Sequence, residues 1–248
     1  GLEKQCKVIM QDVRDLTGLK KLVLRNGIGY IFHLAAQALV PEALINPHLT
    51  LETNIMGTIN VLEVARENPV IKGVVVASSD KAYGKDCKDA REDQRLAGDH
   101  PYDVSKSTAD LIAQTYFKTY GLPVAISRFA NIFGPGDLNM NRLVPGLIKA
   151  IFHKQVFEIR SDGKFTRDYV YVKDVADGYI ALAENIEIVK GEAFNFSYGH
   201  NFSVEDFVKK INGILGEKAE YKIINNQKNE IPAQSLNFEK AKKVLNWQ

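Results

Sequence analysis

The sequence predicts an α/β fold in which helices cover both faces of a doubly wound parallel sheet. Short apolar runs recur along the first half of the chain, and stretches with helical periodicity lie between them. Each run ends in small or polar residues, and ligand chemistry in open α/β sheets collects at the carboxyl ends of the strands. These patterns together place a candidate site at one edge of the sheet.

The first three predicted strands lie at residues 8–10, 30–36 and 73–77. The third is a continuous apolar run, which is typical of a parallel strand that is buried on both faces. The small residues that end the second run would let a flat cofactor approach the backbone. The residues at the three strand ends are Gln11 to Val13, Ala35 and Ala36, and Ser78 and Ser79.

Beyond Arg128 the loops lengthen and the pattern changes. The sequence from there predicts helices at 142–152, 174–184 and 203–215, with strands at 169–172 and 193–196. Ser203 and Asp206 resemble a capping box at the start of the last helix. No repeat or Pro-rich linker is visible, so a second, smaller α/β domain must be interleaved with the first.

Composition narrows the class of protein. Hydrophobic residues make up 45% and charged residues 25% of the chain, as in ordinary globular proteins, and a net charge of +2 predicts no nucleic-acid partner. The cysteines, Cys6 and Cys87, match no metal or redox spacing, and neither do the histidines, so no metal is expected. No segment approaches the ~18 apolar residues that cross a membrane. With no signal-like N-terminus, we expect a cytoplasmic protein.

Tyr102 and Lys106 form the most informative pair in the sequence. They lie four residues apart at the start of a predicted helix, and residues at this spacing share one helix face. The Lys106 ammonium can therefore favour the ionised phenol and lower the pKa of Tyr102 from its ordinary value of about 10. A phenolate near neutral pH is a usable general base. This pair alone is common on helix surfaces. It indicates a catalytic site here because Ser79 lies at the end of the preceding strand.

With these motifs in order, the chain resembles an extended short-chain dehydrogenase/reductase of the NAD-dependent nucleotide-sugar epimerase/dehydratase group. This resemblance implies a Rossmann-type fold. It also implies an NAD-binding domain in residues 1–130 with parts of 165–200, and a sugar-nucleotide-binding domain in residues 131–164 and 201–248. Ser79-Asp80-Lys81 lies where sugar-nucleotide 4,6-dehydratases carry Thr-Asp-Glu, and Asp-Lys there resembles the CDP-glucose 4,6-dehydratase branch. The matching segments are Asp12-Val13, His33 to Ala36, Glu52 to Asn54, Gly57-Thr58, the serine strand end, Tyr102 to Lys106, Arg128 to Gly134, and Arg167 to Asp174.

The resemblance also implies roles for individual residues. Tyr102 would be the base, Ser79 would lie beside the sugar's 4-hydroxyl, and Lys106 would also bond the nicotinamide ribose. Asp80 and Lys81 would be the dehydratase acid and base, although they could be a solvated turn pair. Further contacts to NAD would come from Asp12, Val13, Leu34, Ala35, Ala36, Asn54, Ser78 and Phe129. Asn131, Arg142 and Arg167 would bind the sugar diphosphate, because guanidinium binds phosphate oxygens bidentately.

The chain departs from the family at its start. A dinucleotide-binding fold opens with a strand, a glycine-rich turn and a helix, because glycines let the backbone approach the pyrophosphate. The first glycines here, Gly1, Gly18, Gly27 and Gly29, have the wrong spacing. We therefore expect the first βαβ unit, ~30 residues or more, to be absent from this chain. It is either a shortened form of a longer protein, which the intact active-site motifs favour, or a degenerate paralogue.

These observations predict an NAD-dependent nucleotide-sugar 4,6-dehydratase. It would oxidise sugar carbon 4, eliminate water across carbons 5 and 6, and return the hydride. A 4-epimerase or 4-reductase is the closest alternative, since it shares Ser79, Tyr102 and Lys106 without needing residues 80 and 81. A non-catalytic dinucleotide-fold protein is the second alternative. The resemblance further implies a homodimer in which helices at 49–66 and 104–120 form a four-helix bundle, although both helices could face only their own sheet.

Overall fold

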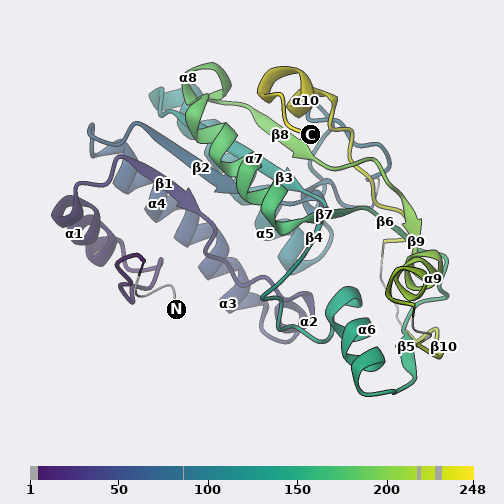
Figure 1. The fold of residues 1–248 in the computed structure, drawn as a ribbon. Helices are drawn as coiled ribbons and strands as arrows, with labels where there is room; N and C mark the ends of the chain where they lie inside the picture. Colours follow the sequence, from purple (N-terminus) through teal and green to yellow (C-terminus); the bar gives the residue numbers. More distant parts are fainter. Residues whose placement is uncertain (1–4, 86, 217–218, 227–230) are drawn as a thin grey trace.

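The computed structural model describes residues 5–85, 87–216, 219–226 and 231–248, and its described part is built around a parallel sheet (Figure 1). The strand order is β1 (Tyr30–His33), β2 (Gly73–Ala77), β3 (Val124–Phe129) and β8 (Ala193–Phe196), with every neighbouring pair parallel. The predicted parallel sheet is therefore confirmed. Its carboxyl edge faces the loops that carry the candidate site residues.

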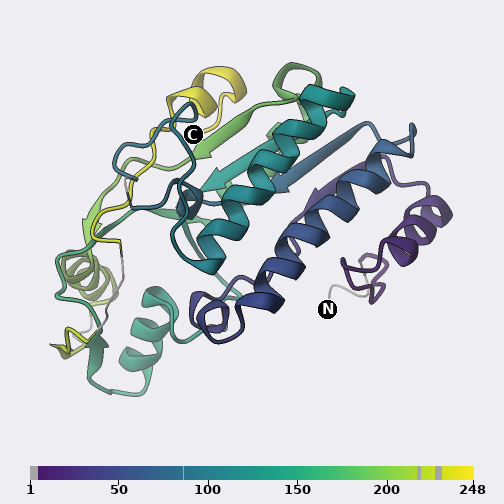
Figure 2. The ribbon, with the colours of Figure 1, turned by 180° about the vertical axis from the view of Figure 1, so that it is seen from behind.

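Helices cover both faces of this sheet, as a doubly wound fold requires. On one face α4 (Gly57–Arg66) and α5 (Pro101–Tyr120) lie side by side, and α1 (Leu16–Asn26) packs against α4 (Figure 2). The other face carries α7 (Val172–Glu184), α8 (Ile186–Val189) and α10 (Glu239–Leu245) (Figure 1). Side chains alternate along β2, so Val75 joins one core and its neighbours Val74 and Val76 join the other.

The C-terminal half adds smaller elements beyond the carboxyl edge of the sheet. A satellite core formed by Leu147, Ile159, Val208 and Ala219 lies among α6 (Leu143–Phe152), α9 (Val204–Leu215), β5 (Phe157–Ile159) and β10 (Tyr221–Ile223) (Figure 1). Short strand pairs connect it to the main sheet. These are β4 (Asn131–Phe133) with β7 (Tyr169–Tyr171), and β6 (Thr166–Arg167) with β9 (Phe202–Ser203).

Most predicted elements appear within a residue or two of their expected bounds. The helix expected at 49–66 is divided into α3 (Pro47–Leu51), a π-helical turn (Glu52–Met56) and α4, and α2 (Val40–Ile45) precedes it. The expected cap of α9 is also present, because the Ser203 hydroxyl accepts the Asp206 backbone N–H at 3.0 Å.

The strand predicted at residues 8–10 is wrong. These residues form no strand, and Met10 is 93% exposed. A strand needs a neighbour for its backbone hydrogen bonds, and β1 pairs with β2 alone among the described strands. The local apolar pattern was therefore insufficient to form an element there.

Among the described residues, no helix is both long and apolar enough to cross a membrane.

A buried ion pair fixes α5 to the sheet. The Arg128 guanidinium on β3 donates to both carboxylate oxygens of Asp110 on α5, at 2.8 and 2.9 Å, and both side chains are almost fully buried. Arg128 also donates to the Tyr83 hydroxyl at 2.6 Å, and Tyr83 donates to Asn195 on β8 at 2.8 Å. One hydrogen-bonded network thus joins α5, the neighbouring strands β3 and β8, and the turn that follows β2.

Breaking this pair should destabilise the fold strongly. Asp110→Asn leaves the Arg128 guanidinium buried without a counter-charge, so we expect the free energy of unfolding to fall by about 3–5 kcal/mol in urea denaturation. Glu187→Gln, which breaks the exposed pair with Lys190, is the control and should cost at most about 1 kcal/mol. Equal losses for the two variants would contradict a central role for the buried pair.

Candidate active site

The turn after β2 is organised by Ser79. The Ser79 hydroxyl accepts the Lys81 backbone N–H at 3.2 Å and donates to the Asp80 carboxylate at 3.0 Å. It thereby caps the 3₁₀ helix Asp80–Tyr83, as a serine at such a turn commonly does. The Asp80 side chain is buried as a result. Ser79 has both the capping role and a position in the site.

Tyr102 and Lys106 occupy the first two turns of α5, which begins at Pro101. The Lys106 ammonium donates to the Ala77 carbonyl at the end of β2 over 2.7 Å, and it lies 6.0 Å from the centre of the Tyr102 ring. The Ser79 hydroxyl lies close enough to the Tyr102 phenol to lower its pKa. The structure therefore brings together the trio that the sequence singled out.

The expectation that Lys106 lowers the pKa of Tyr102 is wrong for this structure. Burial raises the pKa of the phenol above its ordinary value, the nearby Asp80 carboxylate raises it further, and only the nearby Ser79 hydroxyl among the larger effects lowers it. Burial also lowers the pKa of Lys106 to about 8. Lys106 is buried and Tyr102 is half-buried, and desolvation of the charged forms outweighs the attraction between an ammonium and a phenolate. Tyr102 is a protonated phenol at neutral pH here.

The loop after β1 is held in place by Asn54. Its side-chain amide donates to the Gln37 carbonyl at 3.0 Å and to Ser105 on α5 at 2.8 Å, and its oxygen accepts the Gln37 N–H at 2.7 Å. This buried side chain lies in the π-helical turn, and such turns are frequent at functional sites. Asn54 thus supports the backbone that carries Leu34, Ala35 and Ala36, of which the first two are exposed.

Asp12, Val13 and Phe129 were also predicted to contact a cofactor, and in the structure each of them contacts other residues of the protein. Asp12 pairs with Arg14 at 2.7 Å, and the Arg14 hydrogen bonds lower the pKa of that carboxyl to about 2. The Val13 backbone carbonyl accepts a hydrogen bond from the Asn60 side-chain amide at 2.9 Å. The Phe129 ring lies in the core, stacked on Phe196 at 4.4 Å, so its side chain does not face the loops. His33, expected as buried strand filling, is buried and contacts Thr58.

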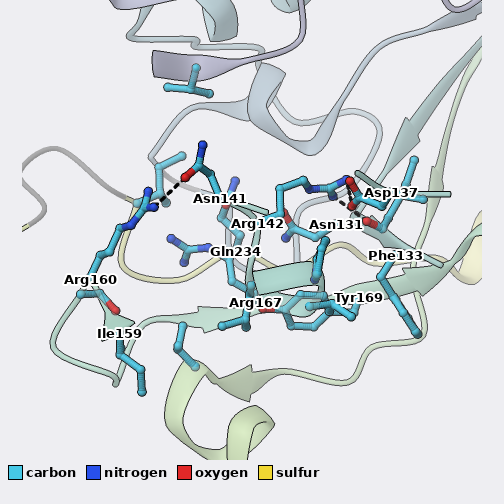
Figure 3. Close-up of a pocket in the computed structure, with 18 of the residues that line it drawn as sticks. Asn131, Phe133, Asp137, Asn141, Arg142, Ile159, Arg160, Arg167, Tyr169 and Gln234 are labelled. Carbon is cyan, nitrogen blue, oxygen red and sulfur yellow. Dashed lines mark hydrogen bonds and ion pairs between the residues drawn. The ribbon is translucent and has the colours of Figure 1, made fainter. Parts of the chain in front are cut away.

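A cavity of about 410 Å³ opens between the sheet edge and the C-terminal elements (Figure 3). Lys81 and Asp103 line it from the side of the main sheet. Asn131, Arg142 and Arg167, all predicted to bind substrate, line it from the other elements. Tyr102, Ser79 and Asp80 are not among its lining residues and adjoin it through their sequence neighbours Lys81 and Asp103.

The cavity wall is rich in cationic side chains. Arg142 pairs with Asp137 at 2.8 Å, and Arg160 donates to Asn141 at 2.9 Å on the opposite side, with Gln234 between them (Figure 3). Arg167 donates to the Thr166 carbonyl at 2.9 Å, and its guanidinium lies 5.8 Å from the centre of the Phe165 ring. Such a wall is suited to an anionic ligand, and Arg160 is a member that the sequence did not single out.

Gln234 is another residue that sequence reasoning missed. Its side-chain oxygen accepts a hydrogen bond from the Lys81 ammonium, although the two residues are 153 positions apart. The side chain is 1% exposed, and its amide nitrogen has no partner among the described residues. No local pattern predicts such a contact.

Asp103 and His100 also line the cavity, and sequence reasoning missed them as well. Their proximity to Tyr102 in the sequence could have indicated that they lie at the site.

The chain matches proteins of known activity along almost all of its length. It is 31% identical to a UDP-glucuronate 4-epimerase of Thermodesulfobacterium geofontis over 96% of this chain and 72% of that protein. It is 30% identical to the CDP-glucose 4,6-dehydratase of Salmonella typhimurium over 95% of this chain and 70% of that protein. The dTDP-glucose 4,6-dehydratase DesIV of Streptomyces venezuelae, solved with NAD, has a similar structure, with a TM-score of 0.86 and 26% identity over 96% of this chain and 73% of that one.

The site's own residues fit a nicotinamide cofactor. The buried Ser78 hydroxyl at the end of β2 has no partner among the described residues, and the desolvated Lys106 ammonium lies at the same strand end. Both are groups that bind the hydroxyls of a nucleotide. The model of the NAD dependent epimerase/dehydratase family matches residues 2–197. The chain therefore belongs to the NAD-dependent epimerase/dehydratase family.

Proposed function

We propose that this protein is a nucleotide-sugar 4,6-dehydratase. The observation that carries the proposal is the Lys81 side chain, which follows Ser79 and Asp80, lines the cavity and is held there by Gln234. A 4-epimerase or 4-reductase needs a proton-transfer group at sugar carbon 4 alone, whereas removal of the carbon 5 proton requires a second base beside it. The similarity to a CDP-glucose 4,6-dehydratase supports this function, and the similarity to a 4-epimerase keeps epimerisation as the second candidate.

Tyr102 and Ser79 act at carbon 4 of the sugar. NAD, when bound, would supply the hydride acceptor for carbon 4 and the hydride donor for carbon 6. The Tyr102 phenol, beside Ser79, exchanges the proton of the 4-hydroxyl, and Lys106 orients the nicotinamide ribose from the end of β2. The ketone formed at carbon 4 acidifies the proton on carbon 5, and Lys81 removes that proton as a neutral amine, after its ammonium has released a proton to solvent.

The remaining predicted residues provide binding. The backbone around Leu34 to Ala36, together with Ser78, Asp12 and Val13, contacts NAD, and Asn54 supports that loop through its bonds to Gln37. Asn131, Arg142 and Arg167, joined by Arg160, bind the diphosphate of the sugar nucleotide. In this division residues 1–130 with parts of 165–200 hold the cofactor, and residues 131–164 and 201–248 hold the substrate.

Product mass separates the candidate functions. The full-length protein is incubated with CDP-, UDP-, GDP- and dTDP-hexoses, and each product is weighed by mass spectrometry. We expect loss of one water from at least one of them. An unchanged mass with altered stereochemistry at carbon 4 would instead establish an epimerase.

A Tyr102→Phe variant is the matched control for this experiment. It keeps the half-buried ring and removes only the hydroxyl, so the rate of dehydration, or of epimerisation, should fall ~100-fold or more while the fold is retained. Near-normal turnover would exclude Tyr102 as the group that transfers the proton.

Gln234 positions Lys81, and its replacement should slow elimination selectively. Gln234→Leu removes the acceptor of the Lys81 ammonium, so turnover to the dehydrated product should fall about 10-fold or more, with little change in KM. Gln234→Glu keeps an acceptor and should retain more activity, and Gln155→Leu on the exposed loop after α6 is the neutral control. A loss confined to KM would contradict the positioning role.

The assembly we propose is a homodimer. Apolar side chains remain exposed on the helical face formed by α3, the π-helical turn and α5, among them Leu49, Met56, Leu111 and Tyr120. An isologous four-helix contact would bury this surface. Light scattering at micromolar concentration should therefore give twice the mass of one chain, and a strictly monomeric mass would reject the dimer.

A further inference from the structure

The side-chain amide of Gln234 has a fixed orientation on the cavity wall. Its oxygen accepts a hydrogen bond from the Lys81 ammonium, and an ammonium group can only donate. The amide oxygen therefore faces Lys81, and the amide nitrogen is turned away from it. Since Gln234 lines the cavity between Arg142 and Arg160 (Figure 3), this nitrogen is a donor available to a ligand there.

This donor is buried and unsatisfied. Gln234 is 1% exposed, and its amide nitrogen has no partner among the residues that the structure describes. Buried side-chain donors are nearly always hydrogen-bonded, because an unmade bond costs free energy. The His100 ring also has a buried nitrogen without such a partner on this wall, but whether it donates or accepts depends on its tautomer. The Gln234 nitrogen can only donate, so it requires an acceptor.

The backbone around Gln234 keeps the side chain in place. The Gln234 N–H donates to the Thr166 carbonyl at 3.2 Å, and the Thr166 N–H donates to the Pro232 carbonyl at 2.9 Å. On the other side, the Ser235 N–H donates to the Cys87 carbonyl at 2.7 Å. Because the segment is held on both sides, the amide cannot turn toward solvent to find a partner. The acceptor is therefore a group that enters the cavity.

The proposed dehydratase function, on which this step rests, identifies the acceptor. Lys81 acts at sugar carbon 5, so the Gln234 amide that contacts Lys81 lies beside that carbon. Carbon 6 is bonded to carbon 5 and carries a hydroxyl group, whose oxygen has lone pairs that accept a hydrogen bond. The 4-hydroxyl already has Tyr102 as its partner, and the diphosphate has the arginines.

We propose that Gln234 is a specificity-determining residue whose amide donates a hydrogen bond to the oxygen on sugar carbon 6. A 6-deoxy sugar has a methyl group at this position, which leaves the buried donor without an acceptor and weakens binding. The same amide distinguishes substrate from product. Elimination removes the carbon 6 oxygen as water, and the returning hydride makes carbon 6 a methyl group. Gln234 thus favours binding of the hexose and release of the product.

The test measures binding instead of turnover. The NAD-loaded full-length Tyr102→Phe protein is the background that does not turn over. Calorimetry gives its Kd for CDP-glucose and CDP-6-deoxyglucose, with the UDP, GDP and dTDP pairs in parallel. This background should bind the hexose ~10-fold or more tightly than the 6-deoxy ligand. Adding Gln234→Leu should raise the affinity for the 6-deoxy ligand about 10-fold, because the methyl group then meets an apolar side chain, and should not raise the affinity for the hexose.

Two further variants control for the fold and for general effects. Gln234→Met keeps the length of the side chain without the amide, so it should give the same gain in affinity for the 6-deoxy ligand. Its melting temperature should stay close to that of the background. Gln155→Leu, on the exposed loop after α6, should leave both affinities unchanged.

Unchanged, weak binding of the 6-deoxy ligand by both Gln234→Leu and Gln234→Met would reject Gln234 as the residue that selects the carbon 6 oxygen. Equal affinities of the background for the two ligands would reject it as well. If the wild type still releases dehydrated product, the dehydratase function stands in either case. A wild type that releases no dehydrated product would reject the dehydratase function, whereas a gain in affinity for the 6-deoxy ligand would still assign the donor to carbon 6.

Discussion

The buried pair between Arg128 and Asp110 is the interaction on which the site depends. It holds α5 against β3, and α5 carries Tyr102, Asp103 and Lys106. The same guanidinium reaches Tyr83, which ends the 3₁₀ helix that begins after Ser79. The buried Arg128 guanidinium therefore holds α5 close to the turn that follows β2. These two segments carry the proposed proton-transfer groups. Two further bonds fasten the first turns of α5. Lys106 donates to the Ala77 carbonyl at the end of β2, and the Ser107 hydroxyl donates to the Ala82 carbonyl in the 3₁₀ helix.

The substrate cavity depends on a second set of long-range contacts. The segment around Gln234 is held by backbone hydrogen bonds, Gln234 to Thr166 at 3.2 Å and Ser235 to Cys87 at 2.7 Å. These bonds join the C-terminal part of the chain to the loop that follows the Ser79 turn. Gln234 then contacts Lys81 directly. The segment around Gln234 that lines the substrate cavity is thus connected to the turn that carries Lys81. A ligand that orders this segment would also order the turn.

The features of this molecule that could be predicted are those that depend on local sequence alone. The strand at 73–77 is a continuous apolar run, and Ser79, Tyr102 and Lys106 follow at motif spacing, so both were found. Residues 8–10 have a similar pattern without a neighbouring strand, and pairing is not a local property. The contact between Lys81 and Gln234 spans 153 positions. The pKa of Tyr102 was predicted in the wrong direction because burial, which decides it, follows from the assembled fold.

The most direct test is a crystal structure of the full-length protein with NAD and an unreactive sugar nucleotide. The distance to measure is the one between the sugar's 4-hydroxyl oxygen and the Tyr102 hydroxyl. We expect a hydrogen bond of about 3 Å, with carbon 6 beside Lys81 and the diphosphate at Arg142 and Arg167. A diphosphate bound at those arginines with the 4-hydroxyl out of reach of Tyr102 would contradict the assignment of this site.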